Sequence, residues 1–173
     1  MKPIRSLLSI LSLVAISAFA APPDAWHVLG EAKAKAAAEH KAIFVHFGAS
    51  WCGWCKKLDA FLDRPEIKAS FEKYFVSVKL VVQENEQKKT LENPGADTLM
   101  KEWGGPAGLP YSAFLDSRGS LIVNSKNNGD NIGFPAQPSE VDYFVQMMKK
   151  AAPNMTEADL KTIQAALTPP KKT

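Results

Sequence analysis

Short apolar runs, rich in β-branched and aromatic residues, recur along this chain between amphipathic segments. Runs of this kind are typical of strands. They predict strands at residues 42–48, 75–82, 111–115 and 121–124. The last two flank the turn-forming tetrapeptide at residues 116–119 (DSRG), so we expect them to pair as an antiparallel hairpin.

Helical patterns fill most of the remaining sequence. An Ala-rich stretch after Pro22-Pro23 carries Glu and Lys among its alanines, which is typical of a surface helix. Ser139 with Asp142, and Thr156 with Asp159, resemble the capping boxes that begin helices. The predicted helices cover residues 24–40, 52–61, 65–74, 96–103, 139–151 and 156–167.

The segments between these elements are polar or rich in Gly and Pro. We expect loops at residues 83–95, 104–110 and 127–138, the first of them exposed to solvent. Residues 42–82 have the order strand, helical crossover, strand, which predicts a right-handed βαβ unit with parallel strands. Together with the antiparallel hairpin, this order predicts an α/β fold with a mixed sheet.

The first twenty residues have the order of a secretory signal peptide. Lys2 and Arg5 precede an apolar stretch from Leu7 to Phe19, and residues 18–20 (AFA) form a small-x-small cleavage signal. The apolar part has about 14 residues, fewer than the ~20 that span a bilayer. We therefore predict cleavage after Ala20, export to a periplasmic or other extracytoplasmic compartment, and no stable insertion in a membrane.

The mature chain predicted in this way is nearly neutral. Cleavage leaves 153 of the 173 residues, with 19 basic and 18 acidic side chains and a net charge of +1. This charge gives no electrostatic reason to expect nucleic acid as a partner. The length suits one domain with a hydrophobic core, and we expect a monomer. We divide the chain into a signal peptide (1–20), one domain (21–152) and a C-terminal helix with a frayed tail (153–173).

The chemistry of the chain centres on its two cysteines, Cys52 and Cys55. A disulfide between such close neighbours constrains almost no unfolded chain, so reactivity explains the pair better than stabilisation does. If Cys52 lies where a strand ends and a helix begins, free backbone N–H groups and the helix dipole favour its thiolate. Cys55 then lies one turn away on the same helical face. We expect Cys52, as the more exposed and more acidic thiol, to attack, and Cys55 to resolve.

Other uses of a cysteine pair fit this sequence less well. A zinc site needs about four ligands, and the chain adds only three scattered histidines. Covalent haem attachment needs a histidine after the second cysteine, where Lys56 stands. The chain also lacks a nucleotide or flavin fingerprint such as a strand-borne G-x-G-x-x-G. We therefore expect no metal or cofactor, and a partner protein that supplies the redox equivalents.

Residues 49–56 (ASWCGWCK), after an apolar strand, resemble the active-site segment of the thioredoxin superfamily. Residues 108–110 (GLP) resemble the Gly-Ile/Val-Pro step of that family, whose proline is cis and lies beside the active site. The wider pattern, from Trp26 to about Ala151, is similar to secreted thioredoxin-like proteins and to the C-terminal thioredoxin domain of periplasmic Dsb-type electron transporters. The resemblance implies a thioredoxin-like fold, with helices on both faces of a central mixed sheet.

The resemblance also implies an enzyme, a thiol-disulfide oxidoreductase whose partners are the thiols and disulfides of other proteins. Leu109 and Pro110 would align an extended client beside the cysteines. Trp51 and Trp54 would form a flat apolar platform for that client, unless Trp54 packs in the core. The likeness to the Dsb electron-transfer domain favours a reductase. The alternatives are a disulfide oxidase or isomerase, or a non-catalytic dithiol module that binds a metal or a client.

One position departs from the family pattern. Thioredoxins usually carry a buried Asp six residues before the first cysteine, and here that residue is His46. Strand alternation places its ring beneath the cysteine-bearing helix, where the imidazole either accepts a proton from Cys55 or serves only in packing. Asp59, four residues after Cys55, matches an acidic residue common in Dsb-like relatives. It would tune Cys55 through one water molecule, or belong to a solvated helix face.

Overall fold

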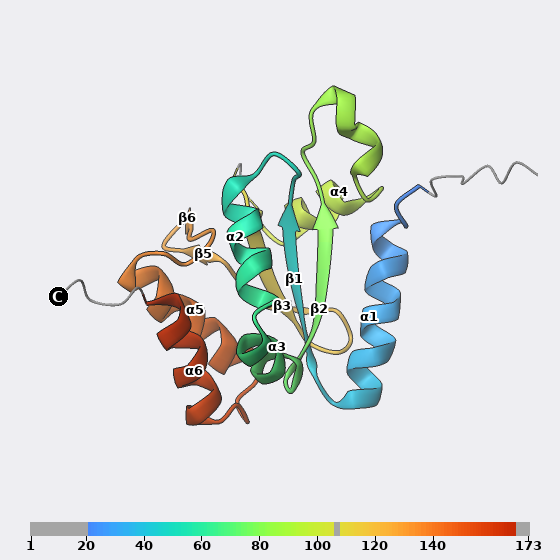
Figure 1. Cartoon of the computed structure of the whole chain (residues 1–173). Coiled ribbons are helices and arrows are strands. Elements are labelled where there is room, and N and C mark those ends of the chain that lie inside the picture. The colour runs from blue at the N-terminus through green and yellow to red at the C-terminus, as the bar shows by residue number, and fades with distance from the viewer. Residues whose placement is uncertain (1–20, 106–107, 169–173) are drawn as a thin grey trace, which may run out of the picture.

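The computed structural model describes residues 21–105 and 108–168 of the chain (Figure 1). Its central sheet consists of β1 (Ala42–Gly48), β2 (Phe75–Val81), β3 (Tyr111–Leu115) and β4 (Leu121–Asn124). The strand order is β2-β1-β3-β4. β1 pairs parallel with β2 and antiparallel with β3, and β4 pairs antiparallel with β3. The predicted mixed sheet, the parallel pair and the hairpin are confirmed.

Helices cover both faces of this sheet (Figure 1). One face carries α1 (Ala25–Glu39) and α4 (Ala96–Glu102), and the other carries α2 (Gly53–Leu62), α3 (Pro65–Glu72) and α5 (Pro138–Ala151). Successive side chains of a strand point to opposite faces, so β1 contributes to two cores. Val45 and Phe47 pack with residues of α1 and α4, whereas Phe44 packs with residues of α2, α3 and α5. The predicted α/β fold is confirmed.

The C-terminal helix α6 (Glu157–Leu167) packs on the same core as α3 and α5. Thr156 caps it, as the sequence predicted, because its side-chain oxygen accepts a hydrogen bond from the N–H of Asp159. The Asp159 carboxylate accepts hydrogen bonds from Nζ of Lys73 (2.9 Å) and from the hydroxyl of Tyr74 (2.8 Å), just after α3. Apolar packing and one carboxylate therefore hold α6 against the domain.

Two segments predicted to be loops contain regular structure. The segment 83–95 includes a 3-10 helix at Glu86–Leu91, whose residues are exposed as predicted, whereas the side chain of Glu84 is buried. The later loop includes a small two-stranded sheet of β5 (Lys126–Asn127) and β6 (Asp130–Asn131). These predictions were wrong because short elements with polar side chains lack the apolar periodicity that predicts helices and strands.

The start of α5 also differs from the prediction. Gln137 is the N-cap, rather than Ser139, and Pro138 occupies the first turn. The Glu140 carboxylate accepts hydrogen bonds from the backbone N–H groups of Gln137 (2.8 Å) and Ala136 (2.9 Å). Proline is favoured at the first helical position because the N–H that it lacks would have no partner there. The helix therefore begins earlier than the Ser139 pattern indicated.

Within the described part of the chain, no helix is long and apolar enough to cross a bilayer. The predicted signal peptide (1–20) lies outside the described residues. The same is true of residues 106–107 in the Gly/Pro-rich loop and of residues 169–173 in the predicted tail.

Candidate active site

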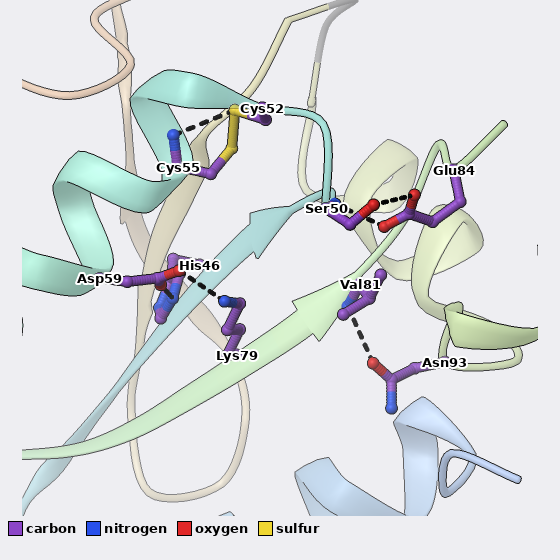
Figure 2. A network of polar contacts seen from close by, with 9 residues as sticks. All are labelled: His46, Ser50, Cys52, Cys55, Asp59, Lys79, Val81, Glu84 and Asn93. Atoms are coloured by element: carbon purple, nitrogen blue, oxygen red, sulfur yellow. Dashed lines mark hydrogen bonds and ion pairs between the residues drawn. A yellow bond between two sulfur atoms is a disulfide. The ribbon is translucent and has the colours of Figure 1, made fainter. Parts of the chain in front are cut away.

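Cys52 and Cys55 form a disulfide at the start of α2 (Figure 2). β1 ends at Gly48, a turn follows, and Cys52 takes the N-cap position of α2. The Sγ atom of Cys52 accepts a hydrogen bond from the backbone N–H of Cys55 at 3.0 Å. The free N–H groups and the positive end of the helix dipole meet at this sulfur, and both stabilise a thiolate. The structure thus places both cysteines where the sequence predicted.

The two cysteines are almost equally buried in this disulfide form. Cys52 is 4% exposed and Cys55 is 1% exposed, so the greater exposure predicted for Cys52 amounts to a small difference. Their positions differ more, because Cys52 caps the helix whereas Cys55 packs down onto β1. A Cβ atom added to Gly48 would lie 3.2 Å from Cβ and 3.4 Å from Sγ of Cys55. Glycine at this position therefore lets the strand pass directly beneath Cys55.

His46 lies beneath α2, as strand alternation predicted, and is 5% exposed. It precedes Gly48 by two residues and so faces the same side of the sheet. Its Nε2 atom is 3.0 Å from Oδ1 of Asp59, which follows Cys55 by about one turn of α2. The other oxygen of Asp59 accepts a hydrogen bond from Nζ of Lys79, the residue opposite His46 on β2. The structure brings the two predicted residues together and adds Lys79, which the sequence analysis missed (Figure 2).

These contacts determine the charge of Asp59 and the tautomer of His46. The hydrogen bond from His46 and, after it, the contact with Lys79 hold the pKa of Asp59 below its ordinary value, against the opposing effect of burial. An ionised Asp59 only accepts hydrogen bonds, so Nε2 of His46 carries the hydrogen of this bond; in the neutral imidazole the lone pair is then on Nδ1. Nδ1 is buried and has no hydrogen-bond partner among the described residues. A cavity of about 360 Å³ borders His46, Asp59 and Lys79.

The Leu109-Pro110 step approaches the cysteine pair through Leu109. The peptide bond of this step is cis, as the resemblance implied, and Leu109 packs against the cysteine pair. Asn131 of β6 holds this step, because its side-chain amide donates to the carbonyl oxygens of Gly108 (3.3 Å) and Pro110 (2.9 Å). The Oδ1 atom of Asn131 accepts a hydrogen bond from the hydroxyl of Ser125 at 2.7 Å, which orients the amide. The sequence pattern around Asn131 predicted no role for this residue.

Both tryptophans of the motif are exposed, Trp51 by 55% and Trp54 by 49%. The alternative in which Trp54 packs in the core is therefore wrong. The Trp54 ring stacks on Phe134 with 6.1 Å between ring centroids, and Nζ of Lys57 lies 3.8 Å from the Trp54 ring centroid. Trp54, Leu109 and Phe134 line a cavity of about 510 Å³ on the Leu109 side of the cysteine pair. Trp54, Leu109 and the segment 129–134 thus border one groove.

Glu84 is a further residue that the sequence analysis missed. Its carboxylate accepts hydrogen bonds from the backbone N–H and from the hydroxyl of Ser50, in the turn before Cys52. In the sequence it stands in the polar run QENEQKK, where nothing distinguishes it from exposed neighbours. Within the described ranges, no group of three or more His, Cys, Asp or Glu side chains is arranged to hold a metal ion.

A family model described as thioredoxin-like matches residues 25–117, more than half of the chain. This chain belongs to the thioredoxin-like family. The match covers both cysteines and Pro110, and it ends before Asn131 and α5. A thioredoxin-like fold with a Cys-x-x-Cys disulfide at a helix N-terminus supports thiol-disulfide oxidoreductase chemistry.

Solved structures are similar to this thioredoxin-like chain. A disulphide isomerase from Xylella fastidiosa Temecula1 gives a TM-score of 0.52 at 22% identity, over 87% of this chain and 94% of that chain. The oxidised C-terminal domain of DsbD from Neisseria meningitidis gives 0.48 at 22% identity, over 74% of this chain and 99% of that chain. A comparison with curated proteins finds no match. At 22% identity and a TM-score of 0.52, the likeness to the Xylella fastidiosa structure shows the fold alone.

Proposed function

We propose that this protein is an extracytoplasmic reductase that reduces disulfide bonds of other proteins through Cys52 and Cys55. The observation that carries the proposal is the hydrogen bond from the Cys55 N–H to Sγ of Cys52 at the N-cap of α2. A sulfur held at this position is stabilised as a thiolate, and the thiolate is the species that attacks a disulfide. The exposed rings of Trp51 and Trp54 beside it support clients as large as proteins.

The exchange has two steps. In the reduced protein the Cys52 thiolate attacks one sulfur of a client disulfide, the client S–S bond breaks, and the second client sulfur leaves as a thiolate that takes a proton from solvent. Cys55 then loses its proton and attacks Sγ of Cys52, which breaks the mixed disulfide and releases the first client sulfur as a thiolate, protonated in turn. The client disulfide is reduced to a dithiol, and the Cys52-Cys55 dithiol is oxidised to the disulfide seen in the structure.

His46 is the proposed acceptor for the proton of Cys55. Its Nδ1 is buried and has no partner among the described residues, and in the neutral imidazole it carries the lone pair that a general base requires. Cys55 packs on Gly48, and His46 is the next residue of β1 on the same face of the sheet. Asp59 would orient the ring and stabilise the imidazolium that forms. In the alternative, His46 contributes only packing against Phe44, on which its ring stacks.

The client would bind in the groove that Trp54, Leu109 and Phe134 line, on the Leu109 side of the cysteine pair. Leu109 packs against the cluster that contains both cysteines, so its backbone groups lie where an extended client could pair with them. The Phe134 ring stacks on the Trp54 ring and adds apolar surface to the lining of the groove. This arrangement favours clients with apolar residues near their cysteine.

The direction of electron flow rests on the resemblance of the wider pattern, from Trp26 to about Ala151, to the Dsb electron-transfer domain. A redox partner protein would reduce the Cys52-Cys55 disulfide again after each turnover. Residues 1–20, with the order of a signal peptide, support an extracytoplasmic location. Oxidase or isomerase activity is the alternative direction, and a non-catalytic dithiol module is the alternative class.

Two measurements test the proposal on the metal-free mature protein. We expect it to accelerate insulin reduction by dithiothreitol, and to have a reduction potential near that of thioredoxin, about −270 mV. A potential near that of DsbA, about −120 mV, would show an oxidase instead. If insulin is not reduced and the dithiol binds copper tightly, the protein is a binding module and the proposed activity is wrong.

A further inference from the structure

Glu84 is a charged residue buried beside the active-site turn. It lies just after the end of β2 and is 5% exposed, whereas Asn85 and Glu86 are exposed. Both of its carboxylate oxygens contact one residue, Ser50 (Figure 2). One oxygen accepts a hydrogen bond from the backbone N–H of Ser50, and the other accepts a hydrogen bond from the Ser50 hydroxyl, with 2.8 Å between the hydroxyl and carboxylate oxygens. Burial of a carboxylate is costly unless hydrogen bonds compensate it, so these two bonds account for its position.

The contacts of Glu84 fall on the central part of a turn. The N–H of Cys52 donates to the carbonyl oxygen of Ala49 at 3.1 Å, which makes Ser50 and Trp51 the two central residues of a β-turn. Glu84 holds the first of these residues. Gln83 holds the second, because its carbonyl oxygen accepts a hydrogen bond from Nε1 of Trp51 at 2.8 Å.

The segment that supplies these contacts is itself anchored. The N–H of Glu84 donates to the carboxylate of Glu92 at 2.8 Å, and Nζ of Lys89 lies 3.0 Å from the same oxygen. Nζ of Lys88 donates to Oγ of Ser50 at 3.4 Å. The charged groups that face this turn from the segment are therefore Glu84, Lys88, and the Lys89-Glu92 pair behind them.

We infer that Glu84 is a positioning residue for Cys52: it holds Ser50, and through this turn it keeps the Cys52 sulfur on the N-terminal N–H groups of α2. The inference rests on the proposed function, since it assigns a cause to the reactivity that thiol exchange needs. If the turn relaxes, Cys52 leaves the N-cap, its sulfur loses the N–H of Cys55, and its thiolate becomes less stable. Glu84 thus acts on Cys52 without touching it.

Two other roles for Glu84 lead to different outcomes. If the carboxylate acted by its negative charge, it would oppose the Cys52 thiolate, and removal of the charge would make Cys52 more reactive. If Glu84 served only stability, its removal would lower the melting temperature and leave the reactivity of Cys52 unchanged. In the positioning role, Glu84→Gln keeps a hydrogen-bond acceptor for Ser50 and preserves the reactivity of Cys52. Glu84→Ala removes the acceptor and lowers that reactivity.

The test measures alkylation of reduced Cys52 by iodoacetamide as a function of pH, in the full mature chain, with thermal unfolding in parallel. We expect Glu84→Ala to raise the midpoint of the Cys52 titration by about one unit and to slow alkylation about tenfold below it. Glu84→Gln should stay within about twofold of the natural protein, as should Glu86→Ala, which removes the same charge from an exposed position of the same segment.

Two results would overturn the positioning role of Glu84. Faster alkylation of Cys52 in both Glu84 variants would show that Glu84 acts by its negative charge. An unchanged alkylation rate with a lower melting temperature would show that Glu84 serves only the stability of the fold. If Glu84→Ala does not fold, Ser50→Ala removes the hydroxyl contacts with Glu84 and Lys88 but keeps the backbone N–H bonded to Glu84, and it should slow alkylation in the same direction by a smaller factor. Alkylation requires no client, so these results do not depend on whether the protein reduces insulin.

Discussion

The Nε2 atom of His46 lies 3.0 Å from Oδ1 of Asp59, so one hydrogen bond joins β1 to α2 one helical turn beyond Cys55. Lys79 of β2 completes the arrangement on the second carboxylate oxygen. Three neighbouring elements therefore meet at a carboxylate whose pKa is lowered, chiefly by the hydrogen bond from His46. The other ring nitrogen, Nδ1, is buried and has no hydrogen-bond partner among the described residues.

His46→Leu should slow resolution of the mixed disulfide by about 10²-fold, the usual worth of a general base, with little effect on attack by Cys52. The reason is that leucine fills the space but accepts no proton. Stopped-flow rates of both steps between about pH 5 and pH 9, the range in which imidazole titrates, provide the measurement. His27→Leu is the matched control, because the His27 side chain is 68% exposed on α1. Unchanged resolution in His46→Leu would assign this histidine to packing.

Asp59→Asn should slow the same step, by roughly tenfold, because an amide can also donate and no longer selects the tautomer with its lone pair on Nδ1. The effect should be largely absent in a His46→Leu background, since both residues act on one proton. A double-mutant cycle on resolution rates measures this coupling. Additive losses would show that Asp59 acts on Cys55 independently of His46.

Cys52→Ser should abolish exchange, whereas Cys55→Ser should accumulate mixed disulfides between Cys52 and its clients. The assignment follows from the N-cap position of Cys52, since exposure hardly distinguishes the two residues. Non-reducing electrophoresis and mass spectrometry of the trapped species identify the linked cysteine. Client adducts on Cys55 of the Cys52→Ser variant would reverse the roles.

Asn131→Ala should raise KM for a protein client with a smaller change in kcat. The substitution removes the donor shared by the carbonyl oxygens of Gly108 and Pro110, so the segment that carries Leu109 loses its support. We expect a stability loss of about 1–3 kcal/mol, the cost of unpaired polar groups. Steady-state insulin reduction and urea unfolding measure both effects. Asn154→Ala, at an exposed position, should change neither.

Asp159 should make the stability of the fold depend on pH. Hydrogen bonds from Lys73, Thr156 and Tyr74 hold its pKa well below the ordinary value. A carboxyl whose pKa is lower in the folded state stabilises that state above its unfolded pKa, about 4, and loses this contribution as pH falls through the folded pKa. The contribution is therefore complete near neutral pH and declines in acid.

Asp159→Asn should accordingly lower the free energy of unfolding by about 2 kcal/mol at neutral pH, and by less in acid. Chemical unfolding at a series of pH values measures the difference. Glu157→Gln, in the same turn of α6, is the control, because the Glu157 side chain is 72% exposed and its ion pair with Lys149 contributes little. An equal loss at every pH would show that the Asp159 charge is not responsible.

The sequence by itself determined which elements form and what chemistry they carry. The apolar run AIFVHFG predicted β1 with the bounds observed, and the pairing of Thr156 with Asp159 predicted the start of α6. Hydrophobic periodicity and capping are local properties, so a single chain reveals them. The spacing of Cys52 and Cys55 likewise indicated disulfide exchange, because that chemistry needs only two sulfurs one helical turn apart.

Only the tertiary structure decided which polar side chains act on that pair. Glu84 reaches Ser50 across 34 positions of the sequence, and Asp59 reaches His46 across 13. A carboxylate in a polar stretch has the same local pattern whether water or a buried N–H group is its partner. The packing of β1, β2 and α2 provides those partners, and long-range packing leaves no periodic trace in the residues around each carboxylate.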